Sequence, residues 1–200
     1  MNVLVCCEES QVVCKAFRAK GHNAFSCDIQ ACSGGHPEWH ITGDCLKFIN
    51  GGSFNVVTGE LFFVPRWDLI IAHPPCTYLS KAGSTCFYIN GERNEERFAK
   101  QKLAAEFFYK IFSADCDKIC IENPVPMRSA GLPGGYVLIQ PYQFGEPYSK
   151  RTCLWLKGLP PLFATCFCSY YRSWTSIHWT AKLRSKTFPG IAAAMAEQWG

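Results

Sequence analysis

The stretch WDLIIAHPPC, residues 67–76, places an apolar run directly before two prolines and a cysteine. The apolar run predicts a short buried strand over residues 67–72. Proline cannot donate a hydrogen bond to a strand ladder and fixes its own backbone, so Pro74 and Pro75 end the strand and stiffen the loop. Cys76 is therefore expected at a rigid strand end, where a nucleophilic thiol is well placed.

The segments around this stretch alternate between strand and helix patterns. Ser10 is the expected N-cap of the first helix and Gly21 its stop, and residues 79–91 are expected to form a loop. Strands are predicted over residues 2–6, 22–28 and 117–124, with further strands over 136–144 and 153–158; helices are predicted over 10–21, 94–112 and 189–200, with a short helix over 44–50. The alternation predicts one α/β domain with a Rossmann-like, mostly parallel sheet covered on both faces.

The composition sets bounds on the class of protein. The chain has 200 residues, 48% of them hydrophobic, which is enough for one substantial core. No apolar run is long enough to cross a bilayer, and the first residues lack the pattern of a signal peptide, so we expect a cytoplasmic protein without membrane contact. The 13 cysteines include no CxxC pair. Most of them are therefore expected to be small buried apolar residues.

Charge is distributed unevenly along the chain. Residues 1–149 carry 13 Lys and Arg against 15 Asp and Glu, whereas residues 150–200 carry 7 against 1. The basic segment also holds four aromatic residues, Tyr170, Tyr171, Trp174 and Trp179. This combination suits a polyanion with stackable bases. A solvated basic face explains the charge equally well.

Polar side chains follow the predicted strands at the edge where α/β sheets bind ligands. Residues 6–10 follow the first strand, Asp28 ends the second, and Glu122 stands near the end of the fourth. A partly buried Glu122 is expected to have a raised pKa, which would let it hold or donate a proton near neutrality. The alternative is a carboxylate that caps a helix or forms a salt bridge.

A metal site is not expected in the Gly- and Pro-containing loop that begins at residue 32. Cys32, His36 and His40 recur every four residues, but Gly34, Gly35 and Pro37 oppose the helix that would align them. A structured loop beside the ligand site is the favoured interpretation. His73 is expected to be a hydrogen-bonding loop residue, and the pair Cys166 and Cys168 to be structural.

The motifs HPPC, residues 73–76, and ENP, residues 122–124, together resemble the PPC and ENV motifs of the DNA cytosine-5 methyltransferases. Other segments agree with this family in order: VLVCCEES (3–10) with its cofactor loop, TGDCLKF (42–48) with its adenine-binding segment, FGEPYSKRTCLWLKG (144–158) with its QxRxR motif, and RSKTFPGIAAAMAEQWG (184–200) with its closing helix. The resemblance spans nearly the whole chain and implies one methyltransferase-like domain over 1–200. It is greatest to short members from phages and prophages.

The resemblance implies a role for each matching residue. The implied cofactor is S-adenosylmethionine, whose ribose Asp28 would hold and whose adenine Asp44 would contact. The implied catalytic residues are Cys76, Glu122, Pro75 and Asn123; the implied cofactor-binding residues are Cys7, Glu8, Ser10, Asp28, Asp44 and Pro74; the implied nucleic-acid contacts are Lys150, Arg151 and Ser80. No metal is implied.

Three departures from the family pattern stand out. The glycine-rich FxGxG loop is replaced by a glycine-free stretch, although Ser10 and the following helix N-terminus still offer N–H donors. The QxRxR motif is reduced to residues 149–152, so only its basic role is carried over. About 25 residues, 158–183, stand in for a large target-recognition region. We therefore expect recognition of a DNA sequence to be weak or supplied by a protein partner.

The implied reaction begins with addition of the Cys76 thiolate to carbon 6 of cytosine, while Glu122 protonates or hydrogen-bonds N3. Carbon 5 then attacks the methyl group of the cofactor, and the target base must be flipped out or single-stranded. Two alternatives stay open. The short recognition region fits a related pyrimidine-C5 enzyme that acts on nucleotides or uses another donor group. The altered loop fits a non-catalytic DNA-binding relative.

Overall fold

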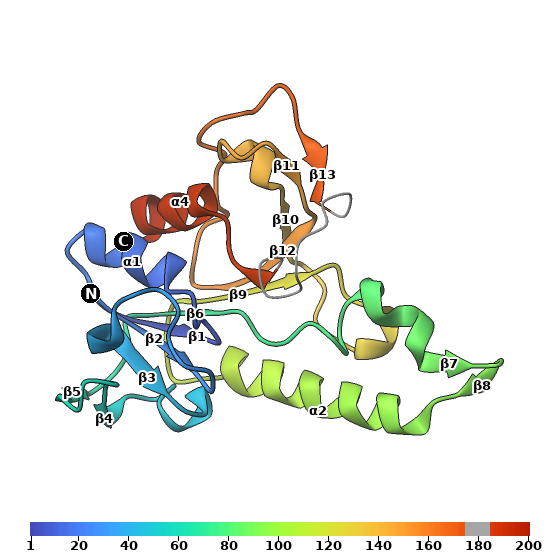
Figure 1. The fold of residues 1–200 in the computed structure, drawn as a ribbon, viewed down its shortest axis with the longest axis horizontal. Helices are drawn as coiled ribbons and strands as arrows, with labels where there is room; N and C mark the ends of the chain where they lie inside the picture. The colour runs from blue at the N-terminus through green and yellow to red at the C-terminus, as the bar shows by residue number, and fades with distance from the viewer. Residues whose placement is uncertain (175–184) are drawn as a thin grey trace.

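A sheet of seven strands organises the part of the chain that this computed structural model describes, residues 1–174 and 185–200 (Figure 1). The strand order is β10 (Val137–Ile139), β12 (Thr152–Lys157), β9 (Ile119–Pro124), β6 (Leu69–Ala72), β1 (Asn2–Cys6), β2 (Asn23–Asp28) and β3 (His40–Thr42). Strand β12 runs antiparallel to both its neighbours, and the other pairs are parallel. The predicted mostly parallel α/β fold is confirmed.

The central strands are buried on both faces because their side chains alternate between two hydrophobic cores. In β1, Val3 and Val5 belong to one core, and Leu4 and Cys6 belong to the other. All four side chains are fully buried. This explains why the strand reads as an unbroken apolar run.

Different elements cover the two faces (Figure 1). Helices α1 (Val12–Ala19) and α4 (Pro189–Trp199) cover one face, where they pack on each other. Helix α2 (Glu95–Phe112) and the hairpin of β4 (Gly52–Asn55) with β5 (Leu61–Val64) cover the other. The sheet is thereby the middle of three layers, which leaves its strand ends as the place where a ligand can reach the backbone.

The predictions for the N-cap of α1 and for residues 79–91 were wrong. Ser10 is not the N-cap of α1: Gln11 holds that position with a φ of 58° and makes no side-chain cap. Residues 79–91 are not simply a loop, because they form the 3₁₀ helix η3 (Lys81–Phe87) and begin a hairpin of β7 (Tyr88–Ile89) with β8 (Glu92–Arg93). The Asn90-Gly91 pair makes the turn of that hairpin, with both residues at positive φ.

Short elements complete the fold. They are the 3₁₀ turns η1 (Pro37–Trp39), η2 (Cys45–Lys47), η4 (Arg128–Ala130) and η5 (Pro141–Gln143), and the two-residue strands β11 (Tyr148–Ser149) and β13 (Arg172–Ser173). The helix expected over residues 44–50 is only the single turn η2. Residues 175–184, which include Trp179 and part of the predicted recognition segment 158–183, lie outside the described residues.

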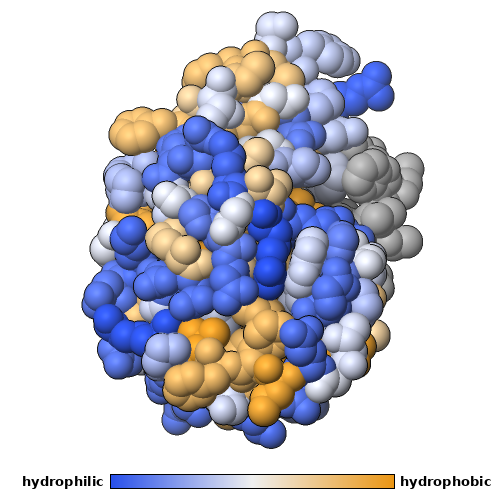
Figure 2. Space-filling model, turned by 90° about the vertical axis from the view of Figure 1, so that its left-hand side faces the viewer, coloured by the Kyte–Doolittle hydropathy of each residue, from blue (hydrophilic) through white to orange (hydrophobic). Residues whose placement is uncertain are grey.

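The hairpin of β4 and β5 presents apolar side chains on both of its sides. Phe54 and Val64 face the core beneath α2, whereas Leu61 and Phe63 are each 69% exposed. Figure 2, which shows this side of the molecule, has hydrophobic side chains gathered at its lower end, over the hairpin. The sequence analysis predicted no strand in this segment. Strands β4 and β5 pair with each other and form a sheet separate from the central one.

Candidate active site

A cavity of about 1020 Å³ opens at the carboxyl ends of β1, β2, β3 and β6. This is the edge where the direction of strand succession reverses, between β1 and β6, and ligands of α/β sheets bind at such a point. Seven of the residues predicted from the sequence line it: Cys7, Glu8, Ser10, Asp28, Asp44, Pro75 and Cys76. Pro74, Ser80, Glu122, Asn123, Lys150 and Arg151 are not part of its lining.

The glycine-free loop after β1 adopts a backbone that normally requires glycine. Cys7 and Gln11 both have a φ of 58°, in the left-handed region. Cys7 is held there by a hydrogen bond from its N–H to the carbonyl of Cys27 on β2. The amide of the buried Gln11 side chain bonds to Ser26 and to the backbone of His36. Surrounding contacts therefore maintain a conformation that the residues themselves do not favour.

Glu8 caps the helix that follows this loop. Its carboxylate accepts hydrogen bonds from the backbone N–H groups of Val13 at 2.6 Å and Cys14 at 3.1 Å. Burial raises the pKa of Glu8 to about 7, although neighbouring His73 and the two N–H groups act in the opposite direction. Two of the helix N–H donors that the sequence offered to a cofactor are thus occupied by the protein itself.

Two carboxylates stand at neighbouring strand ends in the cavity. Asp28 ends β2, and one of its oxygens accepts a hydrogen bond from the N–H of Gln30 at 2.9 Å. Asp44 caps the turn η2 by accepting from Leu46 N–H at 3.0 Å. Gly43 links them, since its N–H donates to the backbone carbonyl of Asp28. The two carboxylates therefore flank one part of the cavity.

An apolar wall beside Asp28 was not identified from the sequence. Ile29 is 78% exposed and Leu103 on α2 is 64% exposed, and both line the cavity together with Phe107. Exposed apolar side chains that line a cavity are typical of a site for a flat, apolar ligand surface. The signal available in the sequence was an isoleucine directly after a strand-ending aspartate.

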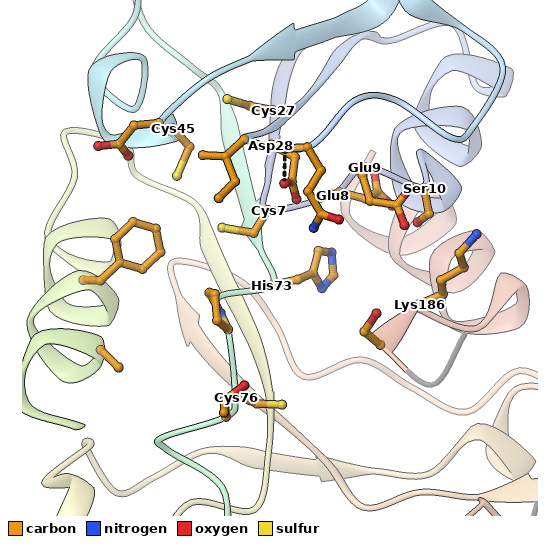
Figure 3. Close-up of a pocket in the computed structure, with 18 of the residues that line it drawn as sticks. Cys7, Glu8, Glu9, Ser10, Cys27, Asp28, Cys45, His73, Cys76 and Lys186 are labelled. Carbon is orange, nitrogen blue, oxygen red and sulfur yellow. Dashed lines mark hydrogen bonds between the residues drawn. The ribbon is translucent and has the colours of Figure 1, made fainter. Parts of the chain in front are cut away.

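Thiol groups form another part of the cavity wall, on the other side of Asp28 from Glu8, Glu9 and Ser10 (Figure 3). Cys7, Cys27 and Cys45 line the cavity, and Cys6 lies behind them in the core. Hydrogen bonds from the thiols of Cys6 and Cys7 lower the pKa of the Cys45 thiol. All 13 cysteines are free, and most are buried, as predicted.

Cys76 stands at the opposite end of the cavity from these thiols, with His73 between it and the loop after β1 (Figure 3). Its carbonyl accepts hydrogen bonds from the N–H groups of Leu79 and Ser80, which close a turn. Ser80 is buried and forms a bridge to Pro126, beyond the end of β9. Ser80 thus supports the Cys76 turn from behind and does not face the cavity.

Asn123 ties the β9 end to the same turn. Its Nδ2 donates to the carbonyl oxygen of Pro74 at 2.8 Å, and both partners are in buried surroundings. Pro74 therefore contacts β9 through its backbone, which explains why it does not line the cavity. Glu122, the preceding residue, is held near this turn by the same strand.

Glu122 lies in a buried hydrogen-bonded group with His73 and Thr187. Its Oε2 is 3.2 Å from Nδ1 of His73 and accepts a hydrogen bond from Thr187 Oγ1 at 3.1 Å. Burial by itself raises the pKa of Glu122, but the bond to His73 and the charges of His73 and Lys150 lower it overall. The predicted upward shift was therefore wrong, because the sequence did not show which partners would be buried beside the carboxylate.

Lys150 and Arg151 have different surroundings. Lys150 acts electrostatically on Glu122 and His73, and its Nζ lies 5.7 Å from the centre of the Phe188 ring. Arg151 is exposed. Three residues of the segment that follows residue 184 also line the cavity: Ser185, Lys186 and Thr187.

Cys32, His36 and His40, whose spacing raised the question of a metal site, each contact a different partner. His36 stacks on Trp39 at 3.8 Å, His40 bonds to Ser26, and the Cys32 thiol donates to Gln11. Within residues 1–174 and 185–200, no group of three or more His, Cys, Asp or Glu side chains is arranged to hold a metal ion. None of the described helices is long and apolar enough to span a membrane.

No family model matches the chain, and no curated protein matches its sequence. Solved structures do match, among them one from E. coli described as a candidate DNA modification methyltransferase encoded within a prophage. The identity to that structure is 13% and the TM-score is 0.47. The match covers 84% of this chain and 52% of the other, so this chain spans about half the length of that protein.

Proposed function

We propose that the protein transfers a methyl group from S-adenosylmethionine to carbon 5 of cytosine in DNA, through a covalent adduct with Cys76. The observation that carries this proposal is a hydrogen bond that joins the end of β9 to the turn after β6. Cys76 lines the cavity after β6, and Asn123, the neighbour of Glu122 on β9, bonds to the turn that holds Cys76. Addition to a pyrimidine ring needs a thiol and a carboxyl group, and this bond connects the backbone segments that carry Cys76 and Glu122.

The donor set of the cavity suits S-adenosylmethionine. The ribose hydroxyls of the cofactor would donate hydrogen bonds to the carboxylate of Asp28, and its adenine ring would pack between Ile29 and Leu103. Lys186 lies on the side of the cavity where Ser10 stands (Figure 3), and its ammonium would attract the carboxylate of the methionine part. The bound cofactor supplies an electrophilic methyl group.

The residues of the chain perform the other steps. The thiolate of Cys76 forms a bond to carbon 6 of the ring, and the electron pair of the 5,6 double bond moves toward N3, which receives a proton at Glu122. Carbon 5 would then take the methyl group that the bound cofactor supplies, and the donor sulfur would leave as a neutral thioether with the electron pair of the broken bond. Loss of the carbon-5 proton to a base and cleavage of the bond between Cys76 and carbon 6 restore the aromatic ring and the free enzyme.

DNA binding in this proposal is largely electrostatic. A cytosine inside a duplex cannot reach Cys76, so the base must be flipped out, which costs a few kcal/mol. Phosphate contacts from the basic segment 150–200, including Lys150 and Arg151, would offset that cost. The segment available for target recognition is short, so we expect weak sequence preference unless a protein partner supplies it.

The first test is nucleoside mass spectrometry after incubation of the purified protein with unmodified DNA and S-adenosylmethionine. The expected product is 5-methyldeoxycytidine, and Cys76→Ala should abolish it. Cys86→Ala is the matched control, because Cys86 is also a free cysteine but is exposed and does not line the cavity. DNA with 5-fluorocytosine should trap the wild-type protein as a denaturation-resistant complex, because fluorine cannot leave carbon 5 as a proton does.

Other outcomes would favour other functions. A modified cytosine of different mass would retain the adduct and change the donor group. Product from free nucleotides but not from DNA would indicate a nucleotide-modifying enzyme. DNA binding without any product or trapped complex would overturn the proposal in favour of a non-catalytic DNA-binding protein.

A further inference from the structure

His73 contacts the carboxylate that the proposed reaction needs as a proton donor. Its Nδ1 lies 3.2 Å from Glu122 Oε2, and Thr187 Oγ1 lies 3.4 Å from the same nitrogen and 3.1 Å from the same oxygen. The three side chains come from the end of β6, from β9 and from the segment before α4. Fold topology, rather than sequence proximity, brings them together.

The pair is well shielded from water. The side chains of His73 and Glu122 are 12% and 10% exposed. A buried ion pair needs hydrogen bonds at its charged groups, and the Glu122 carboxylate has two such contacts, with His73 and with the Thr187 hydroxyl. The pair is therefore a defined arrangement and not a mobile surface contact.

The charged groups around the imidazole favour its protonated form. Burial alone lowers the pKa of His73, but the bond to Glu122 and the negative charges of Glu122 and Glu8 raise it overall, while Lys150 acts in the opposite direction. The same interactions lower the pKa of Glu122. Glu122 is consequently a carboxylate at neutral pH, and its contact with His73 favours the imidazolium form of that ring.

This charge state creates a chemical requirement. A carboxylate has no proton to give to N3 of the ring when Cys76 adds to carbon 6. The two described side chains that carry a proton within hydrogen-bond distance of Glu122 are His73 and Thr187. A hydroxyl is far too weak an acid at neutral pH, whereas an imidazolium ion can release its proton readily.

We infer that His73 is the positioning residue of Glu122, which orients the carboxylate and supplies the proton that Glu122 passes to N3. The inference rests on the proposed function. As the bond between Cys76 and carbon 6 forms, N3 takes a proton from the Glu122 carboxyl, and Glu122 takes the Nδ1 proton of His73, leaving neutral imidazole. When the adduct breaks down, the proton returns from N3 through Glu122 to His73, so protons and electrons balance over the cycle.

A second observation concerns the other ring nitrogen. His73 Nε2 is buried and has no hydrogen-bond partner among the described residues. His73 also lines the cavity, on the path between Cys76 and the loop after β1 (Figure 3). A molecule bound in the cavity that reached Nε2 would exchange a proton with it, which would restore the imidazolium ion without disturbing the bond to Glu122.

The test compares wild type, His73→Gln and Thr187→Val in single-turnover methylation of DNA over pH 5.5 to 9. We expect His73→Gln to lower the rate by about 100-fold, the range of general acid catalysis, without weakening DNA binding. The wild-type rate should fall as pH rises through the raised pKa of His73, and the variant should lose this pH dependence. Thr187→Val should lower the rate less. His36→Gln is the matched control, since His36 pairs with Glu38 outside the cavity.

A measurement independent of catalysis is the nitrogen-15 NMR titration of the His73 imidazole in wild type and in Glu122→Gln. A pKa above 6.5 that falls in Glu122→Gln is expected. An unchanged titration, or a His73→Gln variant with the wild-type rate and pH profile, would overturn the inference. If wild-type protein modifies no DNA, the proposed function fails, and the imidazole titration alone then decides whether His73 and Glu122 share a proton.

Discussion

Asn123 donates its side-chain N–H to the carbonyl oxygen of Pro74 at 2.8 Å, and this single bond joins β9 to the turn after β6. Asn123 directly follows Glu122, and Pro74 precedes Cys76 by two residues. The bond therefore fixes the backbone that carries the carboxylate relative to the backbone that carries the thiol. Mutual placement of reacting groups is a large part of enzymatic rate enhancement, so the bond matters beyond its own stability.

Replacing Asn123 by alanine should impair activity more than stability. The change leaves a buried carbonyl without its donor, which costs about 1–3 kcal/mol of unfolding free energy. The rate of cytosine methylation should fall at least tenfold while the protein stays folded. Urea unfolding and a single-turnover assay measure the two effects. Asn94→Ala removes the side-chain cap of α2 outside the cavity and should cost about 1 kcal/mol with an unchanged rate.

Asp28→Asn should weaken the binding of S-adenosylmethionine. The amide oxygen can still accept the hydrogen bond from Gln30, so the turn is preserved while the negative charge is lost. A hydrogen bond to a charged group contributes about 1.5–3 kcal/mol, which predicts roughly a 10- to 100-fold rise in Kd by calorimetry. Asp68→Asn is the control, because it changes an exposed aspartate that accepts a hydrogen bond from Asn2 at the other end of the sheet. Equal affinities for wild type and Asp28→Asn would contradict the ribose assignment.

The stability of the protein should decline as pH rises from 5 to 8, in part because of Glu8. The unfolded chain titrates this carboxyl near 4.5, whereas burial raises the pKa in the folded state to about 7. The folded state therefore binds more protons between these values, so the stabilisation is present at low pH and is lost as pH rises through 7. The difference corresponds to roughly 3 kcal/mol.

Glu8→Gln removes this effect, because the amide has no charge to bury. The raised pKa of His73 makes stability fall in the same direction above pH 6.5, and Glu8→Gln also reduces that contribution because the charge of Glu8 helps to raise the pKa of His73. Urea unfolding of wild type and Glu8→Gln at pH 5 and pH 8 gives the comparison. A parallel decline of the two proteins would show that Glu8 does not titrate in this range.

Gly190→Ala should destabilise the protein although alanine is the better helix former. A Cβ atom at Gly190 would lie 2.0 Å from the carbonyl oxygen of Phe144, and backbone cannot move aside as a flexible side chain can. We expect a loss of roughly 1–3 kcal/mol. Gly134→Ala is the control: a Cβ there meets no atom within 4 Å and the backbone conformation is ordinary. Thermal unfolding of the two variants beside wild type is sufficient.

The sequence predicted the strand ends well because local chemistry marks them. The apolar run before Pro74 and Pro75 could only be a strand that stops, and the structure has β6 end at Ala72. Glu122 and Pro124 were predicted at the end of a strand for the same reason, and β9 ends there. Residues at the ends of parallel strands share one edge, so the candidate site could be located before its shape was known.

The partners of these residues could not be predicted, because they come from distant segments. Thr187 contacts His73 although 114 positions separate them in the sequence, and the hydrogen bonds that both side chains make with Glu122 lower the pKa of its carboxyl. The Glu8 cap was missed for a different reason: a side chain several residues before a helix rarely caps it, so the pattern favoured Ser10. The left-handed backbone conformations of Cys7 and Gln11 could not be predicted either, since the surroundings of the two residues impose them.

Helix α4 packs on α1, so the last helix of the chain covers an apolar face built by the first. In the chain, 170 positions separate Ala19 from Pro189. A ribosome that adds about 5–20 residues per second needs roughly 10–35 s to cover that interval. Throughout that time Val13 and Phe17 are without the helix that later buries them. Newly made protein is therefore expected to bind chaperones through this apolar face until helix α4 has emerged.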